Sequence, residues 1–349
     1  MARKRHQYPL IEGLEITTLA AEGKSLGRWN DQVVFVPMTV PGDVVDVQIR
    51  NKRRRYMEGY VVRYQKFSEM RCEPFCQHFG VCGGCKWQNL PYDEQLRLKQ
   101  SQVEDQLTRI GKIELPAISP ILGSKKTQLY RNKLEFTFTP RRWLTQEEVA
   151  SGAELDASPA LGFHIPTMFD KVLDIEKCWL QPEPSNAIRL ATKRFCLEHG
   201  YEFYNVREHS GFMRNMIIRT ASTGEVMVIV IFAYRDEERI SALLDHLCEQ
   251  FPEITSMIYM INEKLNDSTG DLEPITYRGN GHIFEQMEGL RFKVGPKSFY
   301  QTNSEQAYEL YKVAREAADL KEGEVLFDLY TGTGTIANFC ASRCAKVVG

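Results

Sequence analysis

The sequence predicts a multidomain protein with an OB-like β-barrel at the N-terminus, an α+β central domain and the start of a doubly wound, Rossmann-like α/β domain. Three observations support this fold class. Short β-rich runs separated by turns fill the first 64 residues, cysteines cluster between positions 72 and 85, and a strand, a glycine-rich turn and a helix follow one another near the C-terminus. The domains expected in the 349-residue chain are 1–66, 67–290 and 291–349.

The composition is that of an ordinary globular protein. Apolar residues make up 43% and charged residues 26%, which excludes disorder, collagen-like structure and low complexity for the chain as a whole. The longest apolar run, residues 226–234, has half the roughly 18 residues that a membrane span needs and predicts a buried strand. The N-terminal segment MARKRHQYPL has no apolar core of the kind found in secretory signals. We therefore expect a cytoplasmic protein without a membrane partner.

Several short strands in residues 8–64 predict a small barrel of the OB type. Valines alternate with other residues in two runs, and Pro41-Gly42-Asp43 predicts the turn between them. Such barrels often bind single-stranded nucleic acid along a basic groove that carries aromatic residues. Arg53, Arg54 and Arg55, followed by Tyr56, are expected at the start of the last predicted strand and are candidate RNA-binding residues. A barrel without this function is the alternative.

Basic residues are concentrated around these arginines, although the net charge of the whole chain is only −2. Residues 50–71 contain eight Lys or Arg and two Asp or Glu. A basic stripe on a nearly neutral protein is typical of a face that binds polyanions, but it also occurs on solvated surfaces. Charge alone leaves both interpretations open.

Beyond the barrel the pattern predicts one helix and then a mixed α+β region. Residues 92–111 carry Leu96, Val103, Leu107 and Ile110 at helical spacing, with Gly111 as the expected C-cap. Further strands are expected at 134–140, 216–221, 226–234 and 256–263, helices at 184–199, 236–250 and 304–319, and a loop at 145–160.

The nine cysteines are unevenly distributed, and Cys76, Cys82 and Cys85 lie close together. In a chain without a secretory signal, clustered thiols more often form a metal site than disulfides. Sulfur ligands suit both zinc and an iron–sulfur cluster, and the spacing leaves both open. Cys178, which follows a predicted strand, is the expected fourth ligand, with Cys72 as its rival. Unrelated buried thiols are the alternative interpretation.

A glycine-rich turn follows the strand that ends at Asp328. Thr331-Gly332-Thr333-Gly334-Thr335 lies between this strand and a predicted helix. Glycines in such a turn let the backbone approach a ligand closely at the carboxyl edge of a parallel sheet. No lysine follows the second glycine, which excludes a Walker A phosphate loop. The turn therefore predicts an adenosyl cofactor, either a dinucleotide or S-adenosylmethionine.

Four segments, in this order along the chain, resemble the RNA 5-methyluridine methyltransferases of the TrmA superfamily. They are FCQHFGVCGGCKWQ, YRNKLEFTF, GPKSFYQTN and FDLYTGTGTI. The first segment and the barrel before it resemble the RumA/RlmD-like rRNA branch, which carries a TRAM domain and a [4Fe-4S] cluster. The resemblance covers nearly the whole chain. It implies S-adenosyl-L-methionine-dependent methylation of uracil C5 in RNA, with 23S rRNA as the expected partner and a monomeric enzyme.

The resemblance also assigns roles to individual residues. The cluster ligands that it implies are Cys76, Cys82, Cys85 and Cys178. The cofactor-binding residues that it implies are Gln301, Asp328, Tyr330, Gly332, Gly334 and Thr335, with Gln301 also at the target uracil. Arg131 and Lys133 match basic residues on the RNA-facing surface of the central domain. The helix at 92–111 is expected to pack on the methyltransferase domain.

The resemblance places the nucleophilic cysteine, the general-base glutamate and the acid that binds the cofactor ribose beyond Gly349. The chain is therefore interpreted as a C-terminally truncated form that is inactive alone. In this chemistry a thiolate adds to uracil C6, the enolate attacks the sulfonium methyl, and a base removes the C5 proton. The target base must first be flipped out of the RNA. The context of Cys340 and Cys344 does not match the catalytic motif, so neither is assigned.

Other functions were weighed against this one. An RNA-binding module without catalysis and a tRNA rather than an rRNA enzyme both stay open. A radical S-adenosylmethionine enzyme needs cysteines spaced C-x3-C-x2-C, and the five residues between Cys76 and Cys82 argue against it. A dehydrogenase built on the glycine-rich turn would need an acid that binds the ribose, and that position lies beyond Gly349.

Overall fold

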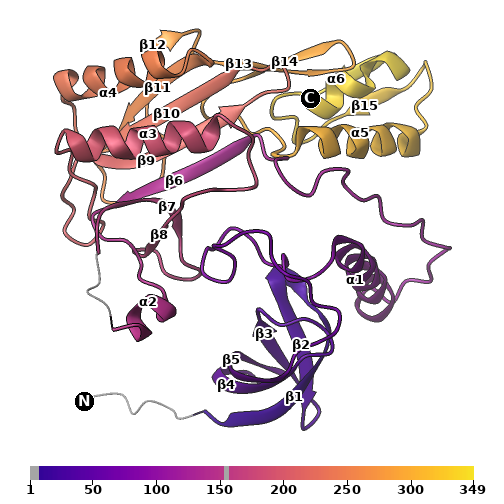
Figure 1. The fold of residues 1–349 in the computed structure, drawn as a ribbon. Coiled ribbons are helices and arrows are strands. Elements are labelled where there is room, and N and C mark those ends of the chain that lie inside the picture. The colour runs from indigo at the N-terminus through magenta and orange to yellow at the C-terminus, as the bar shows by residue number, and fades with distance from the viewer. Residues whose placement is uncertain (1–7, 153–156) are drawn as a thin grey trace. The chain divides into compact units, whose positions relative to one another are not determined.

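The structure is a computed structural model that describes residues 8–152 and 157–349. It divides into two units, Met1–Ser124 and Lys125–Gly349. The first unit contains a closed barrel, and the second contains a seven-stranded sheet followed by a smaller α/β segment (Figure 1). Within the described ranges, no helix combines the length and the apolar composition needed to cross a membrane.

Five strands form the barrel in the order β1-β2-β3-β5-β4, and β4 closes it by pairing with β1. The side chains of Val34, Val36, Val45 and Val47 are fully buried inside it, as the alternating pattern predicts. This confirms the predicted barrel. Its strands are β1 (Leu10–Leu19), β2 (Lys24–Trp29), β3 (Gln32–Pro37), β4 (Val44–Lys52) and β5 (Tyr56–Lys66).

The predicted turn at Pro41-Gly42-Asp43 connects β3 to β4. Gly42 has φ +88°, which a residue with a side chain rarely adopts. The buried Asp43 carboxylate accepts hydrogen bonds from the backbone nitrogens of Val40 (2.8 Å) and Ser68 (2.9 Å), and it pairs with Arg71 at 2.6 Å. The turn therefore fixes the start of the segment that carries the cysteine cluster to the barrel.

The predicted helix at 92–111 is present as α1 (Tyr92–Asp105), which continues through a π-helical turn, Gln106–Ile110. The face that it buries differs from the expected one. Leu98 packs against Leu19, Val40 and Leu90, whereas Ile110 is 79% exposed. The expected packing of this helix on the methyltransferase part concerns the other unit and stays a prediction.

The second unit is built on a mixed sheet with the strand order β12-β11-β10-β9-β6-β7-β8. Strand β10 is buried along its whole length, as its continuous apolar run predicts. Helices α3 and α4 lie side by side against this sheet (Figure 1). The bounds are β6 (Lys133–Thr139), β7 (Ala160–His164), β8 (Val172–Asp174), α3 (Ser185–Glu198), β9 (Met213–Thr220), β10 (Val226–Phe232), α4 (Glu237–Gln250), β11 (Ile254–Ile261) and β12 (Ile275–Gly279).

All four strands and both helices predicted for this region are present, but the predicted loop at 145–160 is partly wrong. It contains the short helix α2 (Gln146–Ala150) and the first residue of β7. Thr145 and Glu148 form a capping box, in which each side chain accepts from the other residue's backbone nitrogen. Residues 153–156 of that loop lie outside the described residues.

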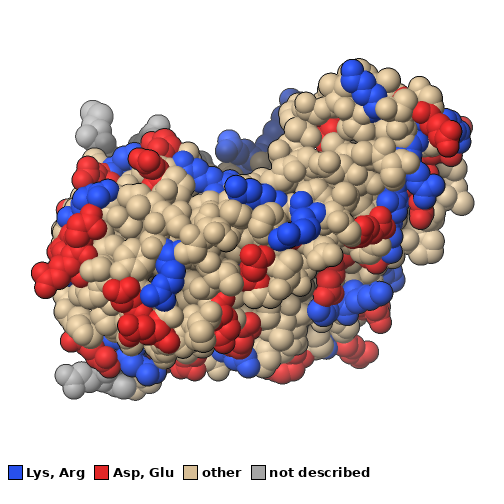
Figure 2. Space-filling view, turned by 90° about the horizontal axis from the view of Figure 1, so that it is seen from above, with Lys and Arg blue, Asp and Glu red and all other residues tan. Residues whose placement is uncertain are grey.

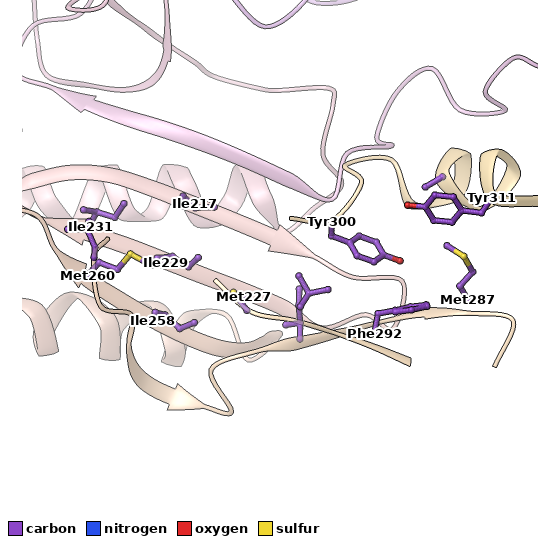
Figure 3. Packing of buried hydrophobic residues seen from close by; sticks show 14 of the residues in the cluster. Ile217, Met227, Ile229, Ile231, Ile258, Met260, Met287, Phe292, Tyr300 and Tyr311 are labelled. Carbon is purple, nitrogen blue, oxygen red and sulfur yellow. The ribbon is translucent and has the colours of Figure 1, made fainter. Parts of the chain in front are cut away.

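One buried hydrophobic cluster of the second unit joins the sheet to the segment that follows it. Isoleucines and methionines of β9, β10 and β11 lie at one end, and Met287, Phe292, Tyr300 and Tyr311 lie at the other (Figure 3). The second group comes from the hairpin β13 (Ile283–Met287) and β14 (Leu290–Val294) and from the chain that leads into and through α5 (Ser304–Ala318). The cluster thus holds α5 at a fixed position beside the sheet.

The C-terminal segment is a strand–turn–helix–strand unit, as predicted up to its helix. Strand β15 (Val325–Phe327), helix α6 (Thr335–Cys340) and strand β16 (Lys346–Val348) follow one another, and the two strands pair in parallel. Two parallel strands joined by a helix form the βαβ unit from which doubly wound sheets are built. The turn between β15 and α6 is therefore at the carboxyl edge where such folds bind nucleotides.

Candidate cofactor and RNA site

The glycine-rich turn brings together five of the six predicted cofactor residues. Gly332 and Gly334 have φ values of +53° and +74°, so both use the backbone freedom that glycine provides. The backbone nitrogen of Asp328 donates a hydrogen bond to the carbonyl oxygen of Val348 in β16 at 2.8 Å, and this bond fixes the start of the turn. Thr335 is buried, whereas the Tyr330 side chain is 97% exposed. The turn thus presents backbone and an uncovered aromatic ring at the strand ends.

Gln301 is the sixth predicted cofactor residue. It is connected to this turn by Tyr311 of α5, which interacts with both Gln301 and Asp328. Burial raises the pKa of Tyr311, the neighbouring Asp328 carboxylate acts in the same direction, and a side-chain hydrogen bond with Gln301 opposes them. Gln301 and the Asp328 charge are therefore both close enough to the Tyr311 phenol to act on its pKa. Gln301 and the glycine-rich turn thus share one buried tyrosine as a neighbour.

A buried polar network holds the segment that carries Gln301. The Asn132 side-chain amide donates to the Gln301 carbonyl oxygen and to Ser304 Oγ, both at 2.8 Å. Ser304 Oγ donates in turn to Glu285 Oε1 at 2.8 Å, and Glu285 is only 2% exposed. The backbone nitrogen of Ser222 completes the network by donating to Glu285 Oε2 at 3.1 Å. Buried carboxylates need such donors, because an unpaired one is costly.

Sequence reasoning missed Asn132, Glu285, Ser304 and Tyr311, although one of them left a signal. Glu285 alternates with Ile283 and Met287 in β13, so the strand pattern places this acid on the buried face. An acidic residue on the otherwise apolar face of a strand indicates a buried polar network. The other three residues could not be assigned, because their partners are distant in sequence.

The predicted RNA-binding residues Arg131 and Lys133 flank Asn132 at the amino end of β6. Lys133 is half-buried, and its pKa is lowered mainly by burial, with the nearby Arg219 and Arg131 charges acting in the same direction. Arg219 is buried and donates to the carbonyl oxygens of Pro296 (3.2 Å) and Ser298 (2.7 Å). Three cationic groups therefore gather beside the Gln301 segment, and Arg219 fixes the chain just before it.

Arg53, Arg54 and Arg55 are all exposed, and they form the turn between β4 and β5 rather than the start of a strand. The turn is closed by the backbone nitrogen of Arg53, which donates to the Tyr56 carbonyl at 2.8 Å. Elsewhere on these two strands the Arg50 guanidinium lies 4.2 Å from the ring centre of Tyr60, which is partly exposed. The barrel surface thus combines cations with an aromatic ring.

The four predicted cluster ligands are divided between the two units. Cys76, Cys82 and Cys85 share one irregular loop of the first unit, where the Gly84 nitrogen donates to Cys82 Sγ at 3.4 Å. Cys178 is buried in the second unit, and its backbone pairs with the Asn186 side chain at 2.8 and 3.1 Å. In the described part of the chain, no three His, Cys, Asp or Glu side chains are arranged to hold a metal ion.

Cys72, the rival ligand, and Cys340, which follows the glycine-rich turn, are both thiols whose pKa is raised by burial. Burial raises the pKa of the Cys72 thiol, and its Sγ lies 3.4 Å from the Gln88 carbonyl oxygen. Cys340 is 3% exposed, and burial raises the pKa of its thiol although Arg315 opposes the shift. A buried thiol with a raised pKa is a poor nucleophile. This supports leaving Cys340 without a catalytic role.

The surface charges of the face shown in Figure 2 do not form a patch of one sign. Lys and Arg side chains alternate there with Asp and Glu and with uncharged surface. A mixed surface of this kind gives little long-range attraction for a polyanion. The candidate phosphate-binding groups are therefore the local basic clusters described above rather than a broad patch on this face.

Comparisons with known proteins agree with this architecture. The TRAM domain family matches residues 11–62, which is the barrel. The chain is 59% identical to a Bacteroides thetaiotaomicron protein over 334 residues, or 95% of this chain and 74% of that protein. It is 53% identical to a Porphyromonas gingivalis protein (96% and 73%) and 35% identical to one from Chlorobaculum tepidum (99% and 72%). All three carry the name uncharacterized RNA methyltransferase.

A solved structure has the same fold. The Pyrococcus abyssi tRNA (uracil-54, C5)-methyltransferase in complex with S-adenosyl-L-homocysteine superimposes with a TM-score of 0.66 and 24% identity, covering 93% of this chain and 69% of that one. The likeness extends over both units of the present structure. The relatives and the TRAM match confirm the family to which the motifs point: the chain belongs to the TRAM-containing RNA methyltransferases.

Proposed function

We propose that the full-length protein methylates C5 of uracil in RNA with S-adenosyl-L-methionine as the methyl donor. The observation that carries the proposal is the convergence of Gln301, Tyr311 and Asp328 at the glycine-rich turn, on the fold of a known uracil-C5 methyltransferase. A polar side chain beside a nucleotide-type turn is the arrangement needed to hold a base next to a cofactor.

The residues of the turn fit an adenosyl cofactor. Gly332 and Gly334 keep side chains away from the backbone at the carboxyl edge of the β15–β16 pair, and the uncovered Tyr330 ring offers a stacking surface. When bound, S-adenosyl-L-methionine supplies an electrophilic methyl group. Asp328 orients the turn, and Gln301 binds and orients the polar edge of the uracil.

Tyr311 and Asn132 position Gln301 for this task. Tyr311 contacts its side chain, and Asn132 binds its backbone carbonyl, so both ends of the residue are held. Fixing a binding group in advance lowers the entropic cost of reaching the reactive geometry. Neither residue needs to touch the substrate.

We assign RNA binding to the barrel and to the amino end of β6. Arg53, Arg54 and Arg55 would contact phosphates through the exposed β4–β5 turn, and Arg131 and Lys133 would do so beside the Gln301 segment. We propose 23S rRNA as the substrate, since the cysteine segment and the barrel resemble the rRNA branch. A tRNA substrate, as in the Pyrococcus abyssi enzyme, is the other candidate. Nucleoside analysis of both RNAs from cells lacking the gene distinguishes them.

The [4Fe-4S] cluster predicted on Cys76, Cys82, Cys85 and Cys178 stays a proposal that rests on the sequence. Thiol ligands and the N–H···S hydrogen bond at Cys82 suit the chemistry of such a cluster. Three of these thiols belong to the first unit and Cys178 belongs to the second, so we derive no step of the reaction from the cluster.

The test is methyl transfer by the full-length protein from labelled S-adenosyl-L-methionine to rRNA and tRNA, followed by nucleoside analysis. We expect label in 5-methyluridine. Gln301→Ala should lower kcat by about 100-fold or more, since it removes a polar contact at the reacting base. The exposed Gln286→Ala in the same unit is the matched control and should leave turnover unchanged. Label in a different nucleoside, or full activity of Gln301→Ala, would contradict the proposal.

A further inference from the structure

We infer that the second unit carries a separate pocket for an unpaired nucleotide of the RNA, at the carboxyl end of β6. The inference rests on the proposed RNA substrate and adds a binding site to it. The pocket has a volume of about 440 Å³, enough for one nucleotide, and its walls include Arg141, His164, Phe169, Lys171, Tyr204 and Arg207.

The pocket is distinct from the Gln301 site. Strand β6 starts at Lys133, next to Asn132, and ends at Thr139, which lines the pocket. Seven strand residues at about 3.3 Å each place roughly 20 Å between its two ends. One uracil cannot occupy both sites, so the pocket would take a different nucleotide of the same RNA.

Phe169 provides the surface on which a base can stack. Its side chain is 71% exposed in the loop between β7 and β8, and the Arg207 guanidinium lies 5.8 Å from its ring centre. An exposed phenylalanine beside a guanidinium is the pairing that single-strand-binding proteins use, because every base has a face that stacks on it.

One wall of the pocket has hydrogen-bonding capacity that the protein does not use. The Thr137 hydroxyl oxygen lies 3.1 Å from His164 Nε2, and it accepts a hydrogen bond from the Asn215 side-chain amide at 3.3 Å. Within the described residues, His164 Nδ1 is buried and has no hydrogen-bond partner. Because His164 lines the pocket, this ring nitrogen is available to form a hydrogen bond with the edge of a base.

The charge of the walls suits a phosphate. Arg141, Lys171 and Arg207 face two acids, Asp170 and Glu208, which leaves an excess of one positive charge. Asp170 is already engaged by Arg207 at 2.5 Å and by Lys171 at 3.3 Å, and the Arg207 hydrogen bond holds the pKa of that carboxyl below its usual range. The exposed Arg141 then remains to bind the phosphate of the nucleotide.

The experiment measures binding of the chain to two fluorescein-labelled RNAs, one a single strand and one a blunt-ended duplex of the same length. Phe169→Ala should weaken binding of the single strand about tenfold and leave binding of the duplex unchanged, since only an unpaired base can stack on the ring. Arg141→Gln should reduce the salt slope by about one unit. Phe169→Trp, which keeps an aromatic ring, should bind the single strand as tightly as the unmodified protein does. Leu265→Ala removes a side chain of matched exposure (70%) and should change nothing.

One outcome would contradict the proposed function itself, and three others would overturn only the inference about the pocket. If the unmodified protein binds neither RNA, the proposed function itself fails. If it binds RNA and Phe169→Ala has the affinity of Leu265→Ala, the pocket is not a nucleotide site. If Phe169→Ala weakens both RNAs equally, the ring does not bind an unpaired base. If UMP or AMP binds the pocket as tightly as the single strand, its ligand is a free nucleotide rather than RNA.

Discussion

The side-chain amide of Asn132 donates a hydrogen bond to the backbone carbonyl of Gln301 at 2.8 Å, although 169 residues separate them in the sequence. The first residue before β6 and the segment before α5 are thereby joined at one point. Since the same amide also binds Ser304 Oγ, the loop that carries Gln301 is held at both of its ends. The position of the proposed uracil-binding residue is therefore set by the central sheet.

Asn132→Ala should loosen this loop. It removes three hydrogen bonds, one of them to the buried Glu285 carboxylate, which should lower the free energy of unfolding of the second unit by about 1–3 kcal/mol. Hydrogen exchange of residues 300–304 should accelerate. The exposed Asn280→Ala is the control. Unchanged exchange of this segment would show that Asn132 does not hold it.

Tyr311→Phe should lower kcat of the full-length enzyme by about three- to tenfold with a smaller change in KM, since one neutral hydrogen bond to Gln301 is lost. If Tyr311 acts through Gln301, the double variant Tyr311→Phe/Gln301→Ala should be no slower than Gln301→Ala alone. Additive effects of the two substitutions would mean that Tyr311 has a separate role.

Replacing Arg53, Arg54 and Arg55 with Gln should reduce the salt slope of RNA affinity by about two to three units, as expected when three phosphate contacts are removed. Barrel folding should be unaffected, because all three side chains are exposed. A triple Gln variant of three exposed cations of the second unit serves as control: Arg194, Arg235 and Lys293. Equal slopes for the two variants would identify the arginine turn as a solvated surface.

The stability of the barrel should depend on pH through Asp46. Its carboxylate accepts hydrogen bonds from the Gly13 nitrogen, Arg63 Nε and Gln65 Nε2, and the Gly13 bond above all lowers its pKa below the ordinary 3.8. Because the unfolded chain binds this proton more readily, the stabilisation is complete above pH 3.8 and is lost as the pH falls through the folded pKa.

Asp46→Asn should therefore destabilise the barrel at neutral pH and flatten this acid dependence. Hydrogen exchange of barrel peptides, corrected for intrinsic rates at each pH, measures both effects. Asp31→Asn, in the exposed β2–β3 turn, is the control and should preserve the pH dependence. If the Asp46 variant retains the full acid dependence, another group is responsible for it.

If Cys76, Cys82, Cys85 and Cys178 ligate a [4Fe-4S] cluster, protein purified without air should be brown and contain about four iron and four sulfide ions per chain. Cys178→Ser should lower the iron content and destabilise the protein, whereas Cys72→Ser should leave the cluster intact. A colourless protein with stoichiometric zinc would replace the iron–sulfur assignment with a zinc site.

The elements that the sequence predicted well have strong local signals. The barrel follows from valines that alternate through β3 and β4, and the βαβ unit follows from an apolar strand directly before glycines. Helix α2 (Gln146–Ala150) was not predicted, although Thr145 and Glu148 stand at the spacing of a capping box and so gave a local signal for it. Strand β8, with three residues, is too short to show a period.

The burial of α1 and the contacts of the candidate site could not be predicted in the same way. Helical spacing identified Val103 and Ile110 as a face, but Leu98 is buried because the barrel supplies a neighbour there. Sequence motifs identified Gln301 and the glycine-rich turn. The role of Asn132 could be recognised only from the structure, in which the start of β6 lies beside the Gln301 segment. The periodicity of a sequence indicates which side chains share one face of a helix or strand. It does not indicate which distant residues that face will contact, because those contacts depend on the topology of the whole unit.

The closed barrel has a consequence for self-association. Each of its five strands is hydrogen-bonded on both sides, and the parallel β3–β5 pair and the β1–β4 pair leave no free edge. An unpaired edge is the usual template for strand exchange and aggregation. The barrel can therefore accumulate at high local concentration on a long RNA without nucleating cross-β assemblies, and any partner must be recognised through its turns and side chains.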